Sequence, residues 1–264
     1  MSTSLLDLLG AGFISGLIVK LLDYFYREYS LKSQEKKSAR KLIDKNLDPI
    51  LKASDELVGK IRSLAQADFQ ELIRAPRPVR KDFEKWFPYL DLMYLFAHFW
   101  ARIQILRLEG LFANLGTDKR GNKLLAFFRA LESAKIGLVG RAWQRGMGDS
   151  LIKQVGADYY AISFADFTKE FLSNEEFNRW FVPLLTVLFN VKDSATRQRL
   201  LVYCAIVHAL IDTLDEKHIV TGEKPGWPNK LTQKSRRDLQ FRTFRLYLPF
   251  VKNPGRYLSG NEPV

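Results

Sequence analysis

The N-terminal segment Leu5–Tyr26 is the part of the sequence that most constrains the fold. Its 22 residues read LLDLLGAGFISGLIVKLLDYFY. As a helix the segment is about 33 Å long, enough to cross the hydrocarbon core of a bilayer. Twelve of the residues are Leu, Ile, Val or Phe. They favour insertion by roughly 4–7 kcal/mol, and the charges of Asp7, Lys20 and Asp23 near the two ends offset most of that gain.

Three further features favour a membrane anchor. Gly12 and Gly16 have the GxxxG spacing that lets two helices approach closely in lipid, and Lys20 and Asp23 are charges that a second copy could pair with. Tyrosines follow at the predicted membrane interface, and a basic run comes directly after them. The positive-inside rule then predicts an inner-membrane protein that faces the cytoplasm. The alternative is an apolar helix that packs on the body of the protein or on a partner subunit.

The net charge of +12 lies mainly in two terminal segments. Residues 27–45 hold seven basic and three acidic side chains, and residues 223–264 hold nine basic and three acidic ones. In the first segment Lys37, Lys41 and Lys45 repeat every four residues, so they share one helix face that would meet anionic lipid head groups. The charge therefore points first to a membrane surface and second to nucleic acid.

Apolar residues at helical spacing through most of the chain predict an all-α fold. We expect three regions: an anchor or association helix at 1–30, a cytosolic multi-helix bundle at 31–222 with a basic start, and a basic-aromatic tail at 223–264. Asp48-Pro49 predicts a helix start, and Pro88 predicts the start of a long apolar helix to about Asn114.

Further along the chain, residues 114–122 are expected to form a loop. Helices are predicted at 123–139 and at 150–160. Another helix is predicted from Asp193 or Ser194 to Glu216, and a short one near 236–247. The single cysteine, Cys204, lies in an apolar run and is predicted to be a buried hydrophobic residue rather than part of a disulfide scaffold.

Two groups of residues are candidates for a ligand site. Along the long apolar helix, polar side chains recur at helical spacing and would form either an anion pocket around Arg102 or an internal row of salt bridges. These side chains are Asp91, Tyr94, His98, Arg102 and Glu109. In the glycine-rich segment 137–148, Arg141 and Arg145 would form an anion nest, or the glycines would simply allow close helix packing.

Two other groups are weaker candidates. His208, Asp212 and Asp215 share a helix face, but no second ligand motif accompanies them, so we predict no metal and no cofactor. In the tail, basic and aromatic residues alternate as in surfaces that bind nucleic acid or lipid. Its basic residues of interest are Arg236, Arg237, Arg242 and Arg245.

Three segments resemble a group of uncharacterised bacterial proteins. Residues 45–62 are similar to their "DPLL-AA-DLQ-R-YN" segment, residues 89–107 to their "YLFAQYFGWVEILRRE" helix, and residues 141–149 faintly to "RGQQRAIGE". The similarity covers about a third of the chain and departs from the pattern at Val58-Gly59 and at Trp100-Ala-Arg102. It implies a helical cytosolic domain behind a membrane anchor, and it implies no activity.

The sequence therefore predicts a membrane-anchored helical interaction protein: a scaffold, a sensor or a self-associating effector. Its expected partners are an anionic lipid surface and a second copy or another membrane protein. One cysteine, three histidines and no G-x-S-x-G motif give no recognisable catalytic triad. The alternatives are a soluble nucleic-acid-binding protein that uses the basic tail, and an anion-binding helical bundle with enzymatic activity.

Overall fold

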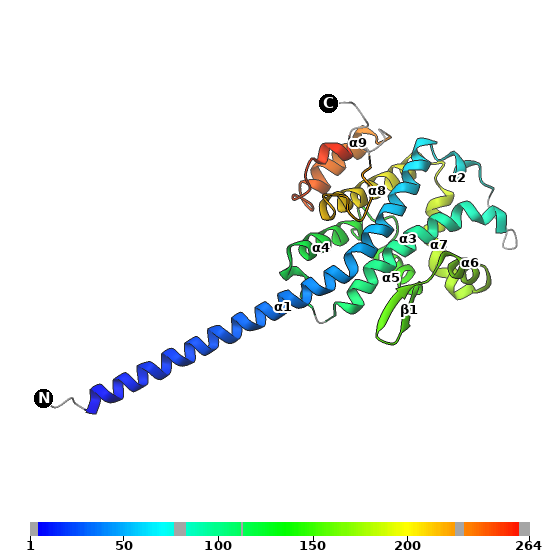
Figure 1. The fold of residues 1–264 in the computed structure, drawn as a ribbon. Helices are drawn as coiled ribbons and strands as arrows, with labels where there is room; N and C mark the ends of the chain where they lie inside the picture. Colours follow the sequence, from blue (N-terminus) through cyan, green and yellow to red (C-terminus); the bar gives the residue numbers. More distant parts are fainter. Residues whose placement is uncertain (1–4, 77–82, 112, 225–229, 259–264) are drawn as a thin grey trace.

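The computed structural model describes the backbone of residues 5–76, 83–111, 113–224 and 230–258. Side chains are described within these ranges, apart from those of residues 5–23, 25 and 83. The described chain is mostly helical, which confirms the all-α prediction, and one small β-hairpin is added to it. Figure 1 shows a body of packed helices from which one long helix, α1, projects.

Helix α1 (Leu5–Gln66) is followed by α2 (Gln70–Arg74) and α3 (Phe83–Glu109). The middle of the chain forms a 3-10 turn η1 (Leu115–Thr117), α4 (Lys119–Leu131), α5 (Arg141–Ser150), and strands β1 (Ile152–Val155) and β2 (Asp158–Ala161). The last part forms α6 (Phe164–Ser173), α7 (Glu175–Phe189), α8 (Ser194–Leu214), α9 (Gln233–Arg237), the π-helical η2 (Asp238–Phe244) and the 3-10 turn η3 (Pro254–Tyr257).

Helices α3 and α8 form the centre of the body. Both contribute many buried apolar side chains, and α8 is buried without interruption from Leu200 to Ile211 except at Val202. The second half of α1 packs against both of them, α5 packs against α3, and α4 packs against α8. The C-terminal segment belongs to the same core, because Leu239, Leu248 and Tyr257 are buried in it.

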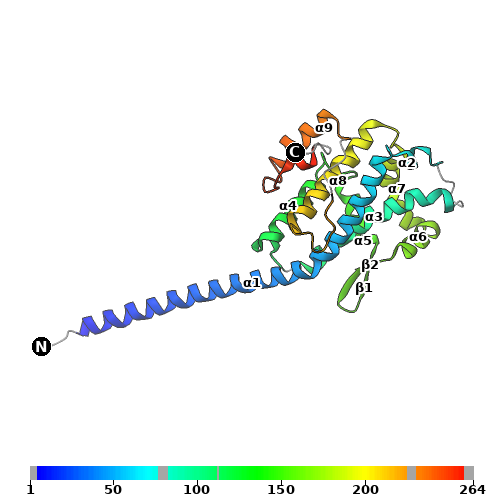
Figure 2. The ribbon, with the colours of Figure 1, turned by 45° about the horizontal axis from the view of Figure 1, so that its top comes forward.

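Helix α1 is continuous where the sequence predicted a start at Asp48-Pro49. Pro49 lies inside the helix, and its ring removes one N–H donor and crowds the preceding turn. Buried side chains on both sides, including Leu47 and Ile50, hold the helix against the body and outweigh that local cost. Figure 2 shows the helix turning as it enters the body, as expected for a helix that contains proline.

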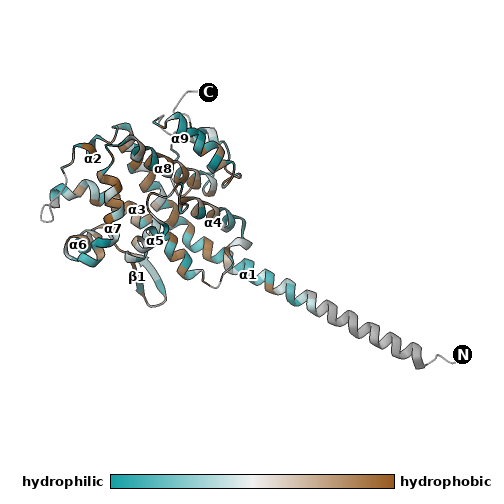
Figure 3. Cartoon of the chain, turned by 180° about the vertical axis from the view of Figure 1, so that it is seen from behind, coloured by the Kyte–Doolittle hydropathy of each residue, from teal (hydrophilic) through white to brown (hydrophobic). Residues whose placement is uncertain are grey.

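The described side chains of the first half of α1, which lie between residues 24 and 38, do not belong to the core. Ala39 is the first buried residue, and none of the described side chains from 24 to 38 is buried. Tyr24, Tyr26 and Tyr29 are 64%, 72% and 76% exposed. Figure 3 shows the described part of this rod mainly in hydrophilic and neutral colours. Residues 24–38 extend about 20 Å from the body at 1.5 Å per residue.

The predicted helix at 150–160 is wrong, because β1 and β2 form an antiparallel hairpin there. Val155 pairs with Asp158, so two residues make the turn, and the first of them, Gly156, has φ +61°. Glycine adopts that conformation without strain, and the flanking β-branched and aromatic side chains favour strands. The predicted loop at 114–122 is also wrong in part, because Asp118 caps α4 by accepting from the N–H groups of Arg120 and Gly121.

Among the residues whose side chains are described, no helix is both long and apolar enough to cross a membrane. Most side chains of the predicted anchor, Leu5–Tyr26, are not among those described. This holds for Gly12, Gly16, Lys20 and Asp23. The membrane-spanning part of the fold prediction therefore has no support from the structure and stays a prediction.

Candidate functional site

The polar side chains predicted to form a row on the long helix lie on α3, where several of them contact one another. The rings of Tyr94 and His98 stack at 5.3 Å with 7° between their planes, and Arg102 Nε donates to His98 Nε2 at 3.2 Å. The Tyr94 hydroxyl donates to the Ile162 carbonyl at 3.1 Å, which ties α3 to the end of the hairpin. Arg102 Nε therefore donates to His98 and does not point into an open pocket.

Burial explains the charge state of this row. Burial, together with the smaller effect of the nearby charge of Arg102, lowers the pKa of His98 to about 4. A neutral imidazole at pH 7 can accept the Arg102 hydrogen bond, which an imidazolium could not. Burial also raises the pKa of the Tyr94 hydroxyl, which keeps that group a hydrogen-bond donor.

The two ends of the row hold α1 against α3. Glu109 Oε2 accepts from the buried Asn46 amide at 2.8 Å, and Lys45 lies 2.9 Å from Glu109 Oε1. Near the other end, Lys60 pairs with Asp91 at 2.9 Å. These contacts favour the interpretation of the row as an internal set of polar contacts between helices.

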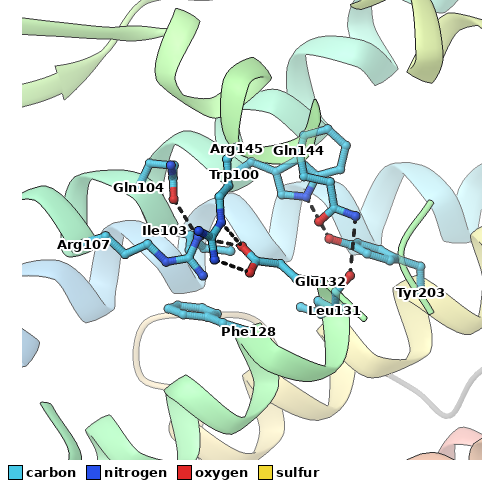
Figure 4. A pocket seen from close by; sticks show the side chains of 10 residues that line it. All are labelled: Trp100, Ile103, Gln104, Arg107, Phe128, Leu131, Glu132, Gln144, Arg145 and Tyr203. Atoms are coloured by element: carbon cyan, nitrogen blue, oxygen red, sulfur yellow. Dashed lines mark hydrogen bonds and ion pairs between the residues drawn. The ribbon is translucent and has the colours of Figure 1, made fainter. Parts of the chain in front are cut away.

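Arg107 and Arg145 converge on Glu132 (Figure 4), and Arg141 is a third partner. Arg107 Nη1 lies 2.6 Å from Glu132 Oε1, and Arg145 Nη2 lies 2.9 Å from Oε2. Arg141 is more distant, at 3.7 Å, and its side chain is 59% exposed. We call Glu132 and its three arginines the Glu132 cluster. It joins α3, α5 and the residue after α4.

The Glu132 cluster carries two positive charges in excess. Burial acts to raise the pKa of Glu132, but hydrogen bonds from Arg145 and Arg107 and their charge outweigh it, so the pKa is lowered and the carboxylate stays ionised. Its side chain is 10% exposed, and three guanidinium groups share it. Loss of Arg141, the most exposed of the three, would leave Glu132 well paired.

The space inside the cluster is too small for an organic ligand. It has room for about one water molecule between Glu132 and two buried aromatic residues, Trp100 and Tyr203, whose side chains hydrogen-bond at 2.8 Å. The glycines nearby serve close packing, as predicted: a Cβ on Gly148 would lie 2.9 Å from the Trp100 backbone. A site for a larger molecule has to lie beside the cluster.

Such a site exists as a groove between residues 132–141 and α7, which we call the α4–α7 groove. It has a volume of about 900 Å³. Its lining is largely apolar and includes Leu138, Val139, Val182, Pro183 and Val187. The groove also contains Arg141, Gly140 and Arg199.

Arg199 fixes one wall of the groove. Its Nη2 donates to the carbonyls of Gly137 and Leu138 at 3.0 and 2.7 Å, and among the described residues no carboxylate forms an ion pair with it. Gly140 precedes the first turn of α5 and offers no side chain to cap the N–H groups there. The groove is therefore electropositive as well as apolar.

Two half-exposed tryptophans lie next to this groove. Trp143 stands in the first turn of α5 and is 42% exposed, and Trp180 stands on α7 and is 43% exposed. Their rings meet edge to face, with centroids 5.6 Å apart and 69° between the planes. Tryptophan and arginine are the residue types most enriched in the energetic centres of protein interfaces.

The acidic end of α8 is part of the packing of the C-terminal segment. Asp212 accepts from the Tyr257 hydroxyl at 2.8 Å, and the Nε2 atoms of His208 and His218 lie 3.6 and 3.8 Å from its other oxygen. Burial lowers the pKa of His208 to about 4 against the opposing effect of Asp212. Among the described residues, no group of three His, Cys, Asp or Glu side chains is arranged to hold a metal ion.

The remaining predicted surface residues are distributed on two separate faces. Lys37, Lys41 and Lys45 are exposed on α1, and Lys45 also pairs with Asp158 of the hairpin at 2.8 Å. In the tail, Arg237, Arg242 and Arg245 are exposed, whereas Arg236 donates to the Leu231 carbonyl at 3.1 Å. A role for either face in binding lipid or nucleic acid stays a prediction.

Sequence reasoning found Arg141 and Arg145 but missed the residues that complete their surroundings. Glu132, Arg107 and Arg199 come from other elements, and no local pattern connects them. The two tryptophans were missed because nothing in the sequence shows that they are exposed. The one available signal was the spacing of four between Arg141 and Arg145, which places both on one face of a helix.

Comparisons with known proteins give no information about the function of this chain. No family model matches the chain, and no significant match was found among the curated proteins or the solved structures. The resemblance to bacterial membrane-anchored proteins therefore stays an expectation.

Proposed function

We propose that this protein is a membrane-anchored, non-enzymatic interaction protein that uses α1 as both anchor and stalk. The observation that carries the proposal is the unpacked half of α1. None of the described side chains of 24–38 is buried, three of them are exposed tyrosines, and the apolar segment 5–23 continues the same helix. A helix with exposed aromatic residues followed by lysines and arginines suits the interface of an anionic membrane.

The body supports the interaction part of the proposal. Some of its buried polar groups hydrogen-bond to one another, as Arg102 does to His98 and Tyr257 does to Asp212, whereas His98 Nδ1 and Asp212 Oδ1 have no hydrogen-bond partner among the described residues. Its open feature is the α4–α7 groove with the neighbouring tryptophans. The stalk would present this groove at a distance from the membrane. Self-association through Gly12 and Gly16 would multiply the number of grooves at one place.

Membrane fractionation tests the proposal. The full chain should sediment with membranes and resist extraction by high salt and by carbonate, and a variant lacking residues 1–30 should stay in the supernatant with an unchanged melting temperature. The unchanged melting temperature follows from the absence of buried side chains in 24–38. Full-length protein that is monomeric and free of membranes would refute the anchor.

A further inference from the structure

The α4–α7 groove combines three properties that rarely occur together on a solvated surface. It is concave, it is walled by apolar side chains, and it carries uncompensated arginines. Val182 at its rim is 50% exposed, and the adjacent Trp143 and Trp180 are more than 40% exposed. Continuous apolar surface of this kind, edged by polar groups, marks a site that another molecule covers.

The side chains that line the groove carry a net positive charge, with Arg141 and Arg199 against Glu132. Arg141 belongs to a cluster in which three arginines share Glu132, and Arg199 contacts only backbone carbonyls among the described residues. Glu132 is the one acidic residue among the described residues that line the groove, and it is already paired. A complementary occupant must bring negative charge.

From this we infer that the α4–α7 groove binds an acidic, partly apolar segment of a partner protein. The inference rests on the proposed function, because it gives the interaction protein a class of partner. Carboxylates of the segment would meet Arg141 and Arg199, and guanidinium groups pair well with carboxylates in two-pronged geometry. Apolar side chains of the same segment would cover Val182 and the exposed faces of the two tryptophans.

The walls of the groove favour a polypeptide over nucleic acid or a free anion. A small anion would satisfy the arginines but would leave Val139, Val182 and Val187 uncovered. Single-stranded nucleic acid binds through bases stacked on open ring faces, and the edge-to-face contact between Trp143 and Trp180 covers part of the ring surface that such stacking would need.

An unbiased peptide selection tests the inference. Full-length protein in detergent would be immobilised and exposed to a random 12-residue phage library, and the enriched peptides would be synthesised with a fluorescent label. We expect sequences rich in Asp and Glu interspersed with Leu, Phe or Trp. Binding should weaken at least tenfold for Arg141→Glu and for Val182→Asp. Lys169→Glu, an exposed charge reversal on α6, is the matched control and should bind normally.

Several results would overturn the inference. One is enrichment of peptides without acidic excess, and another is binding by Arg141→Glu and Val182→Asp that is as tight as binding by the unaltered protein. The others are displacement of the peptides by millimolar sodium phosphate and preferential binding of a labelled 20-mer RNA that depends on Arg141. Melting curves would show that both variants fold, since Arg141 and Val182 are exposed. Both variants should still sediment with membranes. If the full chain bound the peptides but did not sediment with membranes, only the membrane anchor would be refuted. If it sedimented with membranes but selected no acidic peptides, only the role of the groove would be refuted.

Discussion

The two halves of α1 share one continuous backbone but differ in everything that surrounds it. Along 39–66 the helix packs on α3 and α8, and Ile50, Leu57 and Ile61 are fully buried. Along 24–38 none of the described side chains is buried, and the exposed residues include three tyrosines and several basic side chains. Tertiary packing stabilises most protein helices, so the projecting half depends on something outside the chain or on its own local contacts.

The two halves of α1 therefore have different roles. The packed half specifies the fold, and its substitution should affect stability. The projecting half contributes little to the stability of the body, so its sequence is free to serve location and association. Variants in the two halves, chosen to match in chemistry, test that separation.

The largest effect is expected for Ile61→Ala in the packed half. Removing a buried isoleucine side chain leaves a cavity and should lower the free energy of unfolding by about 2–5 kcal/mol. The matched change in the projecting half, Leu31→Ala, should alter it by less than about 0.5 kcal/mol, because Leu31 is 61% exposed. Urea titrations followed by circular dichroism measure both. Equal losses would show that residues 24–38 are part of the folding unit.

Acidification should affect the body alone. The pKa of His98 and that of His208 are about 4 in the folded protein, below the ordinary value of 6.5. Between those two values the unfolded chain binds more protons, so the free energy of unfolding should fall as pH drops from about 6.5 to 4. One pKa unit corresponds to about 1.4 kcal/mol, so each histidine accounts for up to about 3 kcal/mol.

Thermal melts at several pH values measure this dependence. His98→Gln and His208→Gln should each flatten it. Deletion of residues 1–30 should leave it unchanged, since the described part of the projecting half contains no histidine. A slope that neither glutamine variant alters would contradict the assignment.

A smaller effect is expected at the junction of the halves. Glu109→Ala removes an acceptor of the buried Asn46 amide, which then keeps only the Leu42 carbonyl, and should cost about 1–2 kcal/mol. The control is Lys32→Ala, which breaks the exposed Lys32–Glu28 pair of the projecting half and should change nothing measurable. If the two variants melted at the same temperature as the unaltered protein, Glu109 would not help to hold α1 in place.

The parts of the fold that sequence predicted well are those encoded locally. Helix α8 was expected from Asp193 or Ser194 to Glu216 and runs from Ser194 to Leu214, with Asp193 as its cap. The Ser163 cap of α6 is equally local, because a capping side chain and its N–H partner lie three residues apart. Asn174 caps α7 in the same way.

The parts that sequence could not give depend on contacts between distant residues. Pro49 looked like a helix start because the packing that keeps α1 helical through it comes from α3 and α8. Arg107 and Glu132 are 25 positions apart, and Arg199 contacts a carbonyl 62 positions away. The candidate site is assembled by such contacts, so its arginines were identifiable singly while the groove they surround was not.

The continuity of α1 has a mechanical consequence. A helix advances about 1.5 Å and rotates about 100° per residue, so the orientation of the body relative to the start of α1 is set by the number of residues between them. Inserting one residue at 30–36 would swing the α4–α7 groove about 100° around the helix axis, whereas inserting four would return it to within about 40° of its original direction. The number of residues in the projecting half of α1 thus sets the direction in which the groove faces, so its length is as specific a property as its composition.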